Sequence, residues 1–572
     1  MRFWGIARRG WTRGFLSDRV VCVLYEHATP AAEETPCAPP SPEATATPFA
    51  RKRVEISQEE YIQLKWDARY WRGQHQRGLL REAEQKTQIE ELLAQVRDLR
   101  QRLFGRRSEK GAAVSEAQGK SAARRARGQQ PGSAGHGRVD LSHLPVREEE
   151  VADVPSAQQG CPTCHQPLVR FEGTEDSEII EIEVQAYRRR IRRQRYQRSC
   201  DCPTLPGIVT APAAPRLIAK GRLGISVWVQ IVLSKYLYAQ PTHRLLQSWA
   251  NFGLHVAQGT IIGGLKQMAP LFAPVVAAIQ EQQLTEGYYH VDETTWKVFE
   301  PIEGKVGYRW YLWVIVSHLS IVYVPSPSRA AAVPLEYFAH LLVESVLVCD
   351  RYGAYKKFAR IMGVLLAFCW AHVRRDQLEL ARSYPQCADF AMGWVARIGT
   401  LYHLNERRLA VQAQPGMFAE RDLQLRAHLH QMVTDRNTAL ADPTLHAAAR
   451  KVLKSLQNHW EGLTVFVERP EIAMDNNCAE ETLRNEVLGR KAYYGSGSVW
   501  AAQLAGMLFT ILKTLVRCWQ INPQVWLQEY FQACAANGRQ APQDLSAFLP
   551  WRMSPQRLQY LRGPALLPAN TS

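Results

Sequence analysis

The stretch GYYHVDETTWKV (287–298) decides the fold of this chain, because it opens three consecutive runs that are typical of β-strands. YRWYLWVIVSH (308–318) and LSIVYVPS (319–326) are the second and third runs. Aromatic and β-branched side chains dominate all three, and such side chains pack well on a pleated sheet. The three runs therefore predict consecutive strands.

The residues that follow alternate between strand and helix patterns. The sequence predicts a helix near 333–343, strands in ESVLVCD (344–350) and GVLLAFCW (363–370), and a helix from about His372. The resulting order, β-β-β-α-β-α-β, suits a mixed sheet with helices on its faces. The expected fold class is α/β with a ribonuclease H-like core, and a helical insertion over 377–465 precedes its last helix.

Three acidic residues in this region have surroundings that suit metal chemistry. Asp292 and Asp350 lie at or just past apolar strand runs, and Glu480 lies in the first turn of a helix predicted in DNNCAEETLRNEVLGRK (475–491). Carboxylates are hard, anionic ligands for Mg²⁺ or Mn²⁺. Two such ions roughly 3.5–4 Å apart activate an attacking oxygen and stabilise a leaving one. The three acids thus predict a two-metal site for phosphoryl transfer.

Asp292 and Asp350 also have an ordinary structural interpretation. Each is a suitable turn residue at the end of a strand, and Asp350 begins an Asp-Arg-Tyr-Gly turn. Glu293 is expected to point to the face opposite Asp292, because side chains alternate along a strand. Only one of the two neighbours therefore faces a shared metal site.

Glu480 has stronger structural competitors. Asn477 is a suitable N-cap, and Glu480 three residues later would complete a capping box. Glu480 is also spaced to pair with Arg484. Asp475 and Glu481 are rival metal ligands in the same stretch, and spacing alone does not choose among them.

The charge of the chain favours a polyanionic partner. The 572 residues include 70 basic and 54 acidic side chains, a net charge of +16, and nucleic acid is the first candidate. RRRIRRQRYQR (188–198) has no acid, and the alternative is a solvated surface. The candidate phosphate contacts in this stretch are Arg188, Arg189, Arg190, Arg192, Arg193 and Arg195.

The twelve cysteines include two closely spaced pairs, Cys161/Cys164 and Cys200/Cys202. They flank an alternating, strand-like stretch and predict one structural Zn²⁺ held by four thiolates, although the second pair departs from the usual CxxC spacing. The start of the chain has no secretory pattern, and no stretch resembles a membrane span of about 20 apolar residues. We therefore expect a cytoplasmic protein with no membrane partner.

Residues 55–104 have a helical pattern with apolar residues at 3-4-3-4 spacing. The spacing predicts either a short coiled coil, and hence self-association, or one amphipathic helix. The apolar residues are Ile89, Leu92, Val96, Leu99 and Leu103. The predicted segments are an extension (1–54), this helix (55–104), a basic linker (105–150), a zinc module (151–212), a helix-turn-helix-like segment (213–285), the core (286–376 and 466–530) around the insertion (377–465), and a tail (531–572).

The motif at 475–491 resembles the DNN-x-AE-x-x-x-R-x-x-x-x-GRK signature of transposases of the insertion sequence 66 family. Other blocks follow in the same order over about residues 55–555. They are LRQRLFGRRSEK, RGQQPGSAGHGR, CPTC, HVDETTW, CDRYGAY, CWAHVRRD and LPWRM. The resemblance implies that Asp292, Asp350 and Glu480 are an Asp-Asp-Glu catalytic triad on a ribonuclease H-like core. It also implies that the four paired cysteines bind zinc.

The resemblance further implies a DNA transposase of a bacterial insertion sequence. Such an enzyme binds the terminal inverted repeats, cleaves DNA with Mg²⁺ or Mn²⁺, and joins the freed end to target DNA. The implied partners are double-stranded DNA, further copies of the chain and accessory proteins of the same element. A catalytically inactive DNA-binding descendant and a structure-selective nuclease on the same fold remain as alternatives.

The chain departs from the family pattern at three places. Glu481 stands where Arg is usual, Asn485 stands where Pro is common, and LPWRM lacks the usual His. An added acid beside Glu480 would weaken the attraction of nearby phosphate.

CWAHVRRD (369–376) places Cys369 and His372 in C-x-x-H spacing. This pair has too few ligands to predict a zinc site by itself. His372 either positions the substrate strand or belongs to an ordinary helix start with a buried cysteine. The remaining candidate DNA contacts are Arg374, Arg375, Arg490 and Lys491.

Overall fold

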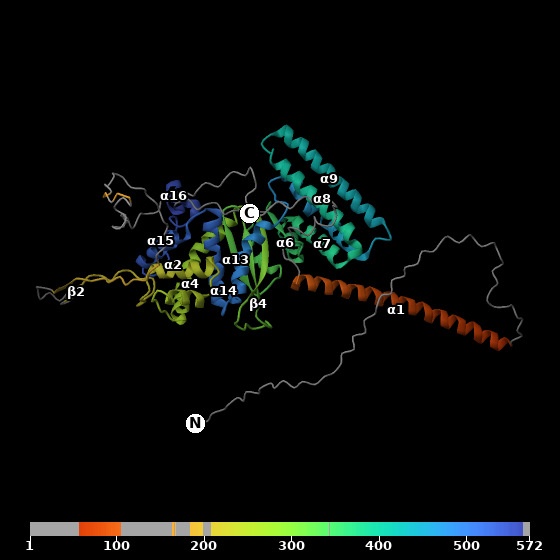
Figure 1. Ribbon diagram of the computed structural model, residues 1–572, viewed down its shortest axis with the longest axis horizontal. Helices are drawn as coiled ribbons and strands as arrows, with labels where there is room; N and C mark the ends of the chain where they lie inside the picture. The colour runs from red at the N-terminus through yellow and green to blue at the C-terminus, as the bar shows by residue number, and fades with distance from the viewer. Residues whose placement is uncertain are drawn as a thin grey trace, which may run out of the picture. The chain divides into compact units, whose positions relative to one another are not determined.

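The computed structural model describes residues 57–104, 163–164, 166–167, 184–197, 208–341 and 344–563. The predicted extension (1–54), the basic linker (105–150) and the zinc ligands Cys161, Cys200 and Cys202 lie outside the described residues. Figure 1 shows the described elements with their labels.

A five-stranded sheet carries the candidate site, and its strand order is β5-β4-β3-β6-β7. β3, β4 and β5 are antiparallel neighbours, whereas β6 and β7 run parallel to β3. This arrangement confirms the mixed sheet that the sequence predicted. The strands are β3 (Tyr288–Lys297), β4 (Arg309–Val316), β5 (Ile321–Ser326), β6 (Val346–Cys349) and β7 (Leu365–Phe368).

The register of the three parallel strands aligns their carboxyl ends. His290 of β3 pairs with Val348 of β6. Two residues further along each strand direction, Asp292 therefore lies level with Asp350. Cys349 pairs with Phe368 across β6 and β7, so Cys369 follows at the level of Asp350. The sheet therefore brings residues from three distant parts of the chain to one edge.

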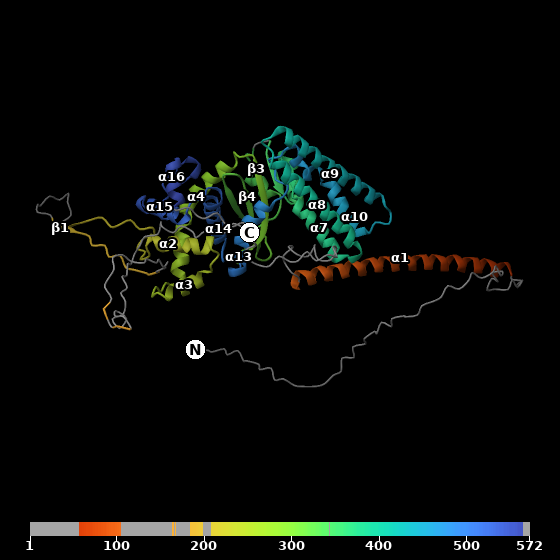
Figure 2. The same cartoon turned by 45° about the horizontal axis from the view of Figure 1, so that its top comes forward.

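Helices cover both faces of the sheet, and each face has its own apolar core. Trp296, Leu312 and Val314 pack on one face against α4, α14 and their neighbours. Val291 and Ile315 pack on the other face with residues of the helical insertion. Figure 2 shows α13 and α14 beside β4, with α7 to α10 on the other side of the sheet. The helices that contact strands of the sheet include α4, α11, α12, α6 (Gly353–Met362), α13 (Asn477–Tyr493) and α14 (Val499–Lys513), and α5 (Ala332–Tyr337) lies against α6.

Helices occupy most of the segment 377–465, as its pattern predicted. This segment separates Asp350 from Glu480 in the sequence, and its side chains join the second core, whereas Ala479 and Leu483 of α13 pack in the first core. Its elements are α7 (Trp370–Ser383), η3 (Pro385–Cys387), α8 (Ala388–Leu409), α9 (Pro415–Ala441), α10 (Ala447–Asn458) and α11 (Trp460–Leu463), and α12 (Val465–Glu468) follows.

The elements on either side of the core are mainly helical. Gly253 has a φ of +78° and lies in the turn between α3 and the long helix α4, within the segment predicted to resemble a helix-turn-helix. The elements before β3 are β1 (Arg195–Gln197), β2 (Ile208–Thr210), α2 (Ile225–Val232), η2 (Leu233–Leu237), α3 (Thr242–Ala250) and α4 (Gln258–Gln283). Those after α14 are η4 (Thr514–Cys518), α15 (Pro523–Ala536), η5 (Pro550–Arg552) and α16 (Pro555–Arg562).

One long helix, α1 (Gln58–Phe104), occupies the segment that the sequence predicted to be helical. The five apolar side chains at 3-4 spacing are all exposed on it, from 44% for Val96 to 71% for Leu103. Such a stripe is the surface that a second helix would cover, and the coiled coil stays a prediction.

Two helices reach the length and hydropathy of a membrane-crossing helix, which the sequence pattern did not predict. They are Gln258–Gln283 and Val499–Cys518, and the most apolar windows of the two are 44% and 61% buried within the protein. α4 and α14 contact each other, and α14 also packs on β5. Their apolar character is thus accounted for by the core that they share.

The packing of α2 on α4 depends on the absence of a side chain at Gly264. A Cβ atom at Gly264 would overlap the buried indole of Trp228, whereas a Cβ atom at Gly263 would meet no atom within 4 Å. We expect Gly264→Ala to lower the free energy of unfolding by about 1–3 kcal/mol, because the indole must shift in a close-packed core. Gly263→Ala is the matched control and should be neutral or stabilising by up to about 1 kcal/mol. Urea denaturation measures both, and equal midpoints for the two variants would contradict this packing.

Candidate active site

Asp292 lies within β3 and not after it, which corrects the prediction of a strand-end residue. β3 continues to Lys297 because its polar half still pairs with β4, where Asp292 lies opposite Val314 and Trp296 opposite Trp310. The Glu293 backbone N–H donates a hydrogen bond of 2.8 Å to Asp292 Oδ1. The carboxylate is therefore fixed on the face of the sheet that α13 covers.

Asp350 directly follows β6, as the sequence predicted. Its Oδ1 accepts a 2.8 Å hydrogen bond from the backbone N–H of Tyr352, the N-cap of α6. Asp350 is therefore a turn residue at the end of a strand and also a candidate metal ligand. The turn bond holds the carboxylate at the edge of the sheet, level with Asp292.

Glu480 reaches this edge from the first turn of α13, and it does not close a capping box. The N-cap is Asn476 rather than Asn477, and no side chain caps the helix. The Asn477 backbone N–H bonds Asp475 Oδ1 at 3.1 Å. The close partners of Glu480 lie on α7, since Oε1 lies 3.6 Å from His372 Nε2 and Oε2 lies 3.5 Å from Arg375 Nη2. The proposed pair with Arg484 is not among them.

The rival acids in the same stretch have other partners. Asp475 turns back to the Asn477 backbone, and Glu481 is exposed and lies 3.1 Å from Arg517 Nη2. The charge of Glu480, by contrast, raises the pKa of Asp292. The Arg517 pair also offsets the charge that Glu481 adds beside the site.

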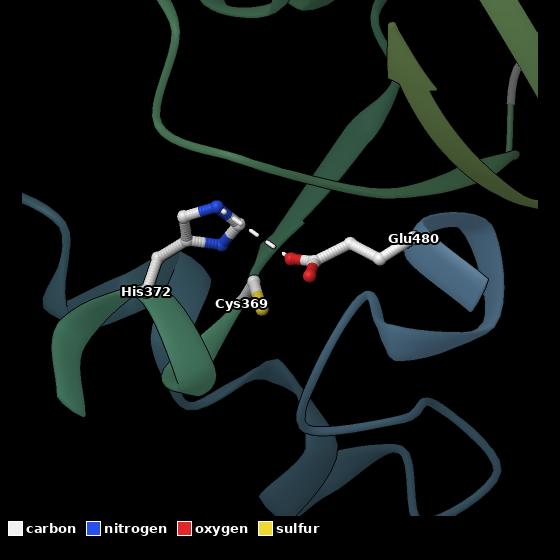
Figure 3. Close-up of side chains that lie close together, drawn as sticks. All are labelled: Cys369, His372 and Glu480. Carbon is white, nitrogen blue, oxygen red and sulfur yellow. Dashed lines mark ion pairs between the residues drawn. The ribbon is translucent and has the colours of Figure 1, made fainter. Parts of the chain in front are cut away.

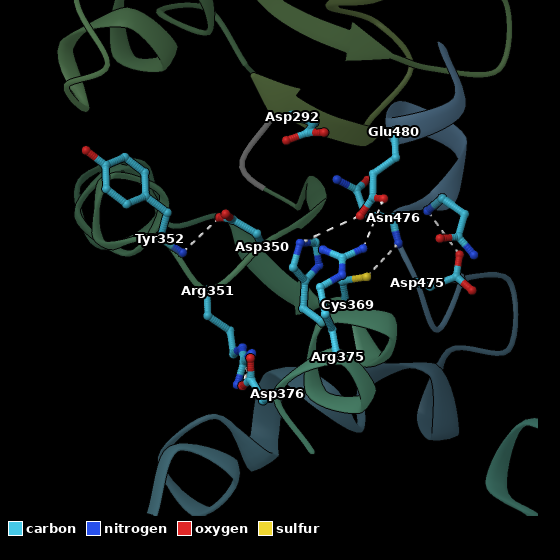
Figure 4. Close-up of polar contacts among 12 residues, drawn as sticks. Asp292, Asp350, Arg351, Tyr352, Cys369, Arg375, Asp376, Asp475, Asn476 and Glu480 are labelled. Atoms are coloured by element: carbon cyan, nitrogen blue, oxygen red, sulfur yellow. Dashed lines mark hydrogen bonds and ion pairs between the residues drawn. The ribbon is translucent and has the colours of Figure 1, made fainter. Parts of the chain in front are cut away.

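The electrostatics of Asp292 reflect a gathering of carboxylates. Burial is the main cause that raises its pKa to about 7, and the charges of Glu293, Glu480 and Asp350 contribute to the rise. Figure 4 shows Asp292, Asp350 and Glu480 around one space, on β3, at the end of β6 and on α13. Three acids in this arrangement repel one another, and a divalent cation between them would remove that repulsion. The donor set fits Mg²⁺ or Mn²⁺.

Glu293 faces the other side of the sheet, in agreement with strand alternation. Its carboxylate is 1% exposed and lies 2.6 Å from Arg329 Nε. Tyr355 donates a second hydrogen bond to it. This neutralised pair leaves Asp292 as the acid of β3 that faces α13.

Residues 220–504, which contain all three acids, match the family model described as Transposase IS66 family. The chain belongs to the transposase IS66 family. It is 26% identical over 431 residues to the uncharacterized protein y4jD of Sinorhizobium fredii, covering 72% of this chain and 80% of that protein. It is 22% identical over 353 residues to the uncharacterized protein y4hP of the same organism, covering 57% and 62%. Membership indicates a transposase that uses divalent metal ions.

Asn476 of this transposase is a site residue that sequence reasoning missed. Its side chain is buried, Nδ2 donates to the Val291 carbonyl at 2.8 Å, and Oδ1 lies 3.1 Å from His290 Nδ1. Its backbone N–H donates to Cys369 Sγ at 3.2 Å. Asn476 thus ties the start of α13 to β3 and to the start of α7. The doubled asparagine before the helix was the available signal, and it was interpreted only as a cap.

Cys369 and His372 also reach the site. Cys369 is the buried N-cap of α7, and His372 lies in the first turn of that helix with its side chain 25% exposed. Burial lowers the pKa of His372, and the nearby charge of Arg375 lowers it further. A neutral imidazole therefore faces Glu480 near neutral pH.

Apart from Arg374 and Arg375, which lie on α7, the predicted DNA contacts fall into two groups. Arg490 is engaged within the fold, because its Nη1 bonds Thr294 Oγ1 at 3.0 Å and Thr295 Oγ1 at 2.7 Å on β3, while Lys491 is exposed. The other group is the exposed stretch 184–197, where Arg195 pairs with Thr210 in the β1–β2 ladder. Cys164 is exposed, and its three predicted partner ligands lie outside the described residues.

The hydrogen bonds of Asn476 predict a specific sensitivity of the transposase to substitution. Asn476→Ala should lower the free energy of unfolding by about 2–4 kcal/mol, since it removes the side-chain donor to the Val291 carbonyl and the partner of His290 Nδ1, two buried polar groups. Asn477→Ala is the matched control, because that side chain is exposed and should change stability by less than about 0.5 kcal/mol. Thermal and urea denaturation measure the difference. Equal stability of the two variants would mean that Asn476 does not hold the site together.

Proposed function

We propose that Asp292, Asp350 and Glu480 hold two Mg²⁺ or Mn²⁺ ions on a ribonuclease H-like core, and that this site cleaves and joins DNA. The observation that carries the proposal is the convergence of the three acids. The register of β3 and β6 sets Asp292 level with Asp350, and the docking of α13 brings Glu480 within electrostatic reach of Asp292. The family match supports the same chemistry.

The reaction is proposed to begin with hydrolysis of a phosphodiester at the end of the element. When bound, the metal ions activate the attacking oxygen and stabilise the leaving oxygen. The 3′-hydroxyl released by the first cut then attacks a phosphodiester of target DNA, and a 3′-oxygen of the target leaves. No covalent bond between protein and DNA is needed. The sheet holds the carboxylates of Asp292 and Asp350 in position, whereas the position of the Glu480 carboxylate depends on the packing of α13 against the sheet.

DNA binding is proposed to rest on the basic surface. The net charge is +16, and the described arginines between 188 and 195 are exposed. The zinc module and the helical segment 213–285 would recognise the inverted repeats, with Arg374, Arg375 and Lys491 as further phosphate contacts. His372 and Arg375 lie beside Glu480, where they would position the scissile strand.

The site is proposed to work within a larger assembly. The exposed apolar stripe of α1 supports association with further copies of the chain. The proposal also includes accessory proteins of the same element as partners. It places the protein in the cytoplasm, without a membrane partner.

Neighbouring acids on α13 provide a direct test of the catalytic assignment. Glu480→Gln should reduce Mg²⁺-dependent nicking of a duplex that carries the element end by roughly a thousandfold, the equivalent of several kcal/mol of transition-state stabilisation. Glu481→Gln should nick within about threefold of wild type, because Glu481 pairs with Arg517 on the surface. End binding, measured by gel shift, should persist in both variants.

The outcomes separate the alternatives. Full nicking by Glu480→Gln would refute the triad. A wild-type protein that binds ends without nicking them in Mg²⁺ or Mn²⁺ would be the inactive descendant. A protein that nicks but fails to join pre-cut ends to target DNA would be a nuclease on the same fold.

A further inference from the structure

Cys369, His372 and Glu480 form a second set of potential metal ligands beside the carboxylate triad. Cys369 is the N-cap of α7, His372 follows one turn later, and Glu480 comes from α13. One ligand atom from each residue lies within 4.8 Å of the others. Figure 3 shows the His372 ring facing the Glu480 carboxylate, with Cys369 beside them. The C-x-x-H pair thus gains in the folded chain the further ligand that the sequence did not provide.

The donor chemistry of this cluster differs from that of the triad. A thiol, an imidazole and a carboxylate together suit Zn²⁺, whereas Mg²⁺ takes oxygen ligands. His372 Nδ1 and Glu480 Oε1 are both buried, and neither has a hydrogen-bond partner. The Asn476 backbone N–H donates to Cys369 Sγ at 3.2 Å, an arrangement that also suits a thiolate.

The geometry requires only a small adjustment to hold an ion. Tetrahedral ligands on bonds of about 2.0–2.3 Å lie roughly 3.3–3.8 Å apart, so ligand atoms within 4.8 Å must move inward by about 1 Å. The side chains of His372 and Glu480 are 25% and 29% exposed, and solvent on that side leaves room for rotation and for a water as fourth ligand. Arg375 is the competing cation, and its half-exposed side chain can turn away.

We propose that Cys369, His372 and Glu480 bind Zn²⁺, and that this ion inhibits DNA cleavage by withdrawing Glu480 from the carboxylate triad. The binding half of this inference stands on the cluster alone, whereas the inhibitory half rests on the proposed function. Glu480 then has two metal partners: oxygen-ligated Mg²⁺ or Mn²⁺ with Asp292 and Asp350, and thiolate-ligated Zn²⁺ with Cys369 and His372.

The binding test uses Co²⁺ as a spectroscopic stand-in for Zn²⁺ in the full chain without DNA. Thiolate-to-cobalt absorption is measured as the difference from wild type, which cancels the signal of the predicted four-cysteine module. Cys369→Ser and His372→Gln should each lose one bound Co²⁺ or weaken its affinity by about tenfold or more. Cys478→Ser and Asp350→Asn are matched controls that should keep it, since Cys478 is exposed on the same turn of α13 and Asp350 is outside the cluster.

Arg375→Gln should have the opposite effect and tighten Co²⁺ binding by about two- to fivefold, because it removes the cation that competes for Glu480. A merely structural role for Cys369 or His372 would not produce this gain. Unchanged Co²⁺ binding in both Cys369→Ser and His372→Gln would overturn the site.

The inhibition test adds Zn²⁺ to the Mg²⁺-dependent nicking reaction. Wild-type protein should lose activity as Zn²⁺ saturates the site that Co²⁺ reports, and Arg375→Gln should lose it at lower Zn²⁺. Nicking that persists with the site saturated would overturn the inhibitory half. Cobalt binding at the cluster in a protein that never nicks DNA would instead refute the proposed function and leave the binding site in place.

Discussion

The hydrogen bonds of one buried amide hold the candidate site together. Asn476 donates to the Val291 carbonyl of β3, its Oδ1 lies 3.1 Å from His290 Nδ1, and its backbone N–H donates to Cys369 at the start of α7. Asn476 is the N-cap residue of α13, and Glu480 lies four residues later on this helix. The other end of α13 is also held, because Gly495, at a φ of +135°, approaches Lys297 so closely that a side chain would overlap it. α13 is therefore fixed on β3 at both ends, and the position of Glu480 follows from that.

Burial and mutual repulsion of the acids explain why such firm support is needed. The pKa of Asp292 is raised to about 7 by burial and by the charge of Glu293, with Glu480 and Asp350 adding to it. Without a cation the three carboxylates would favour moving apart, and the sheet register and the docked α13 prevent this. The Glu293 carboxylate lies on the opposite face of the sheet, where it accepts hydrogen bonds from Arg329 and Tyr355. The architecture thus maintains an electrostatically unfavourable arrangement that a bound divalent cation would relieve.

The sequence predicted the sheet and its helices well because those features depend on local pattern. The strands of 288–326, the order of elements through α7 and the helical segment 377–465 follow from periodicity and side-chain type. It predicted the position of Asp292 less well: the predicted strand 287–298 contains this residue, yet Asp292 was expected at or just past the apolar run, whereas pairing with β4 places it within the strand. The capping box at Glu480 was wrong because the helix begins one residue earlier than that interpretation requires, with Asn476 at the N-cap, and its glutamate meets α7 instead. Neither the buried role of Asn476 nor the meeting of Cys369 and His372 with Glu480 was visible, since both depend on contacts across more than a hundred residues.

The most direct measurement of the central claim is anomalous diffraction from crystals of the full chain containing Mn²⁺. Two manganese peaks roughly 3.5–4 Å apart, bounded by the carboxylates of Asp292, Asp350 and Glu480, are the result that the proposed mechanism predicts. Manganese absent from this space, or coordinated without one of the two strand aspartates, would contradict it.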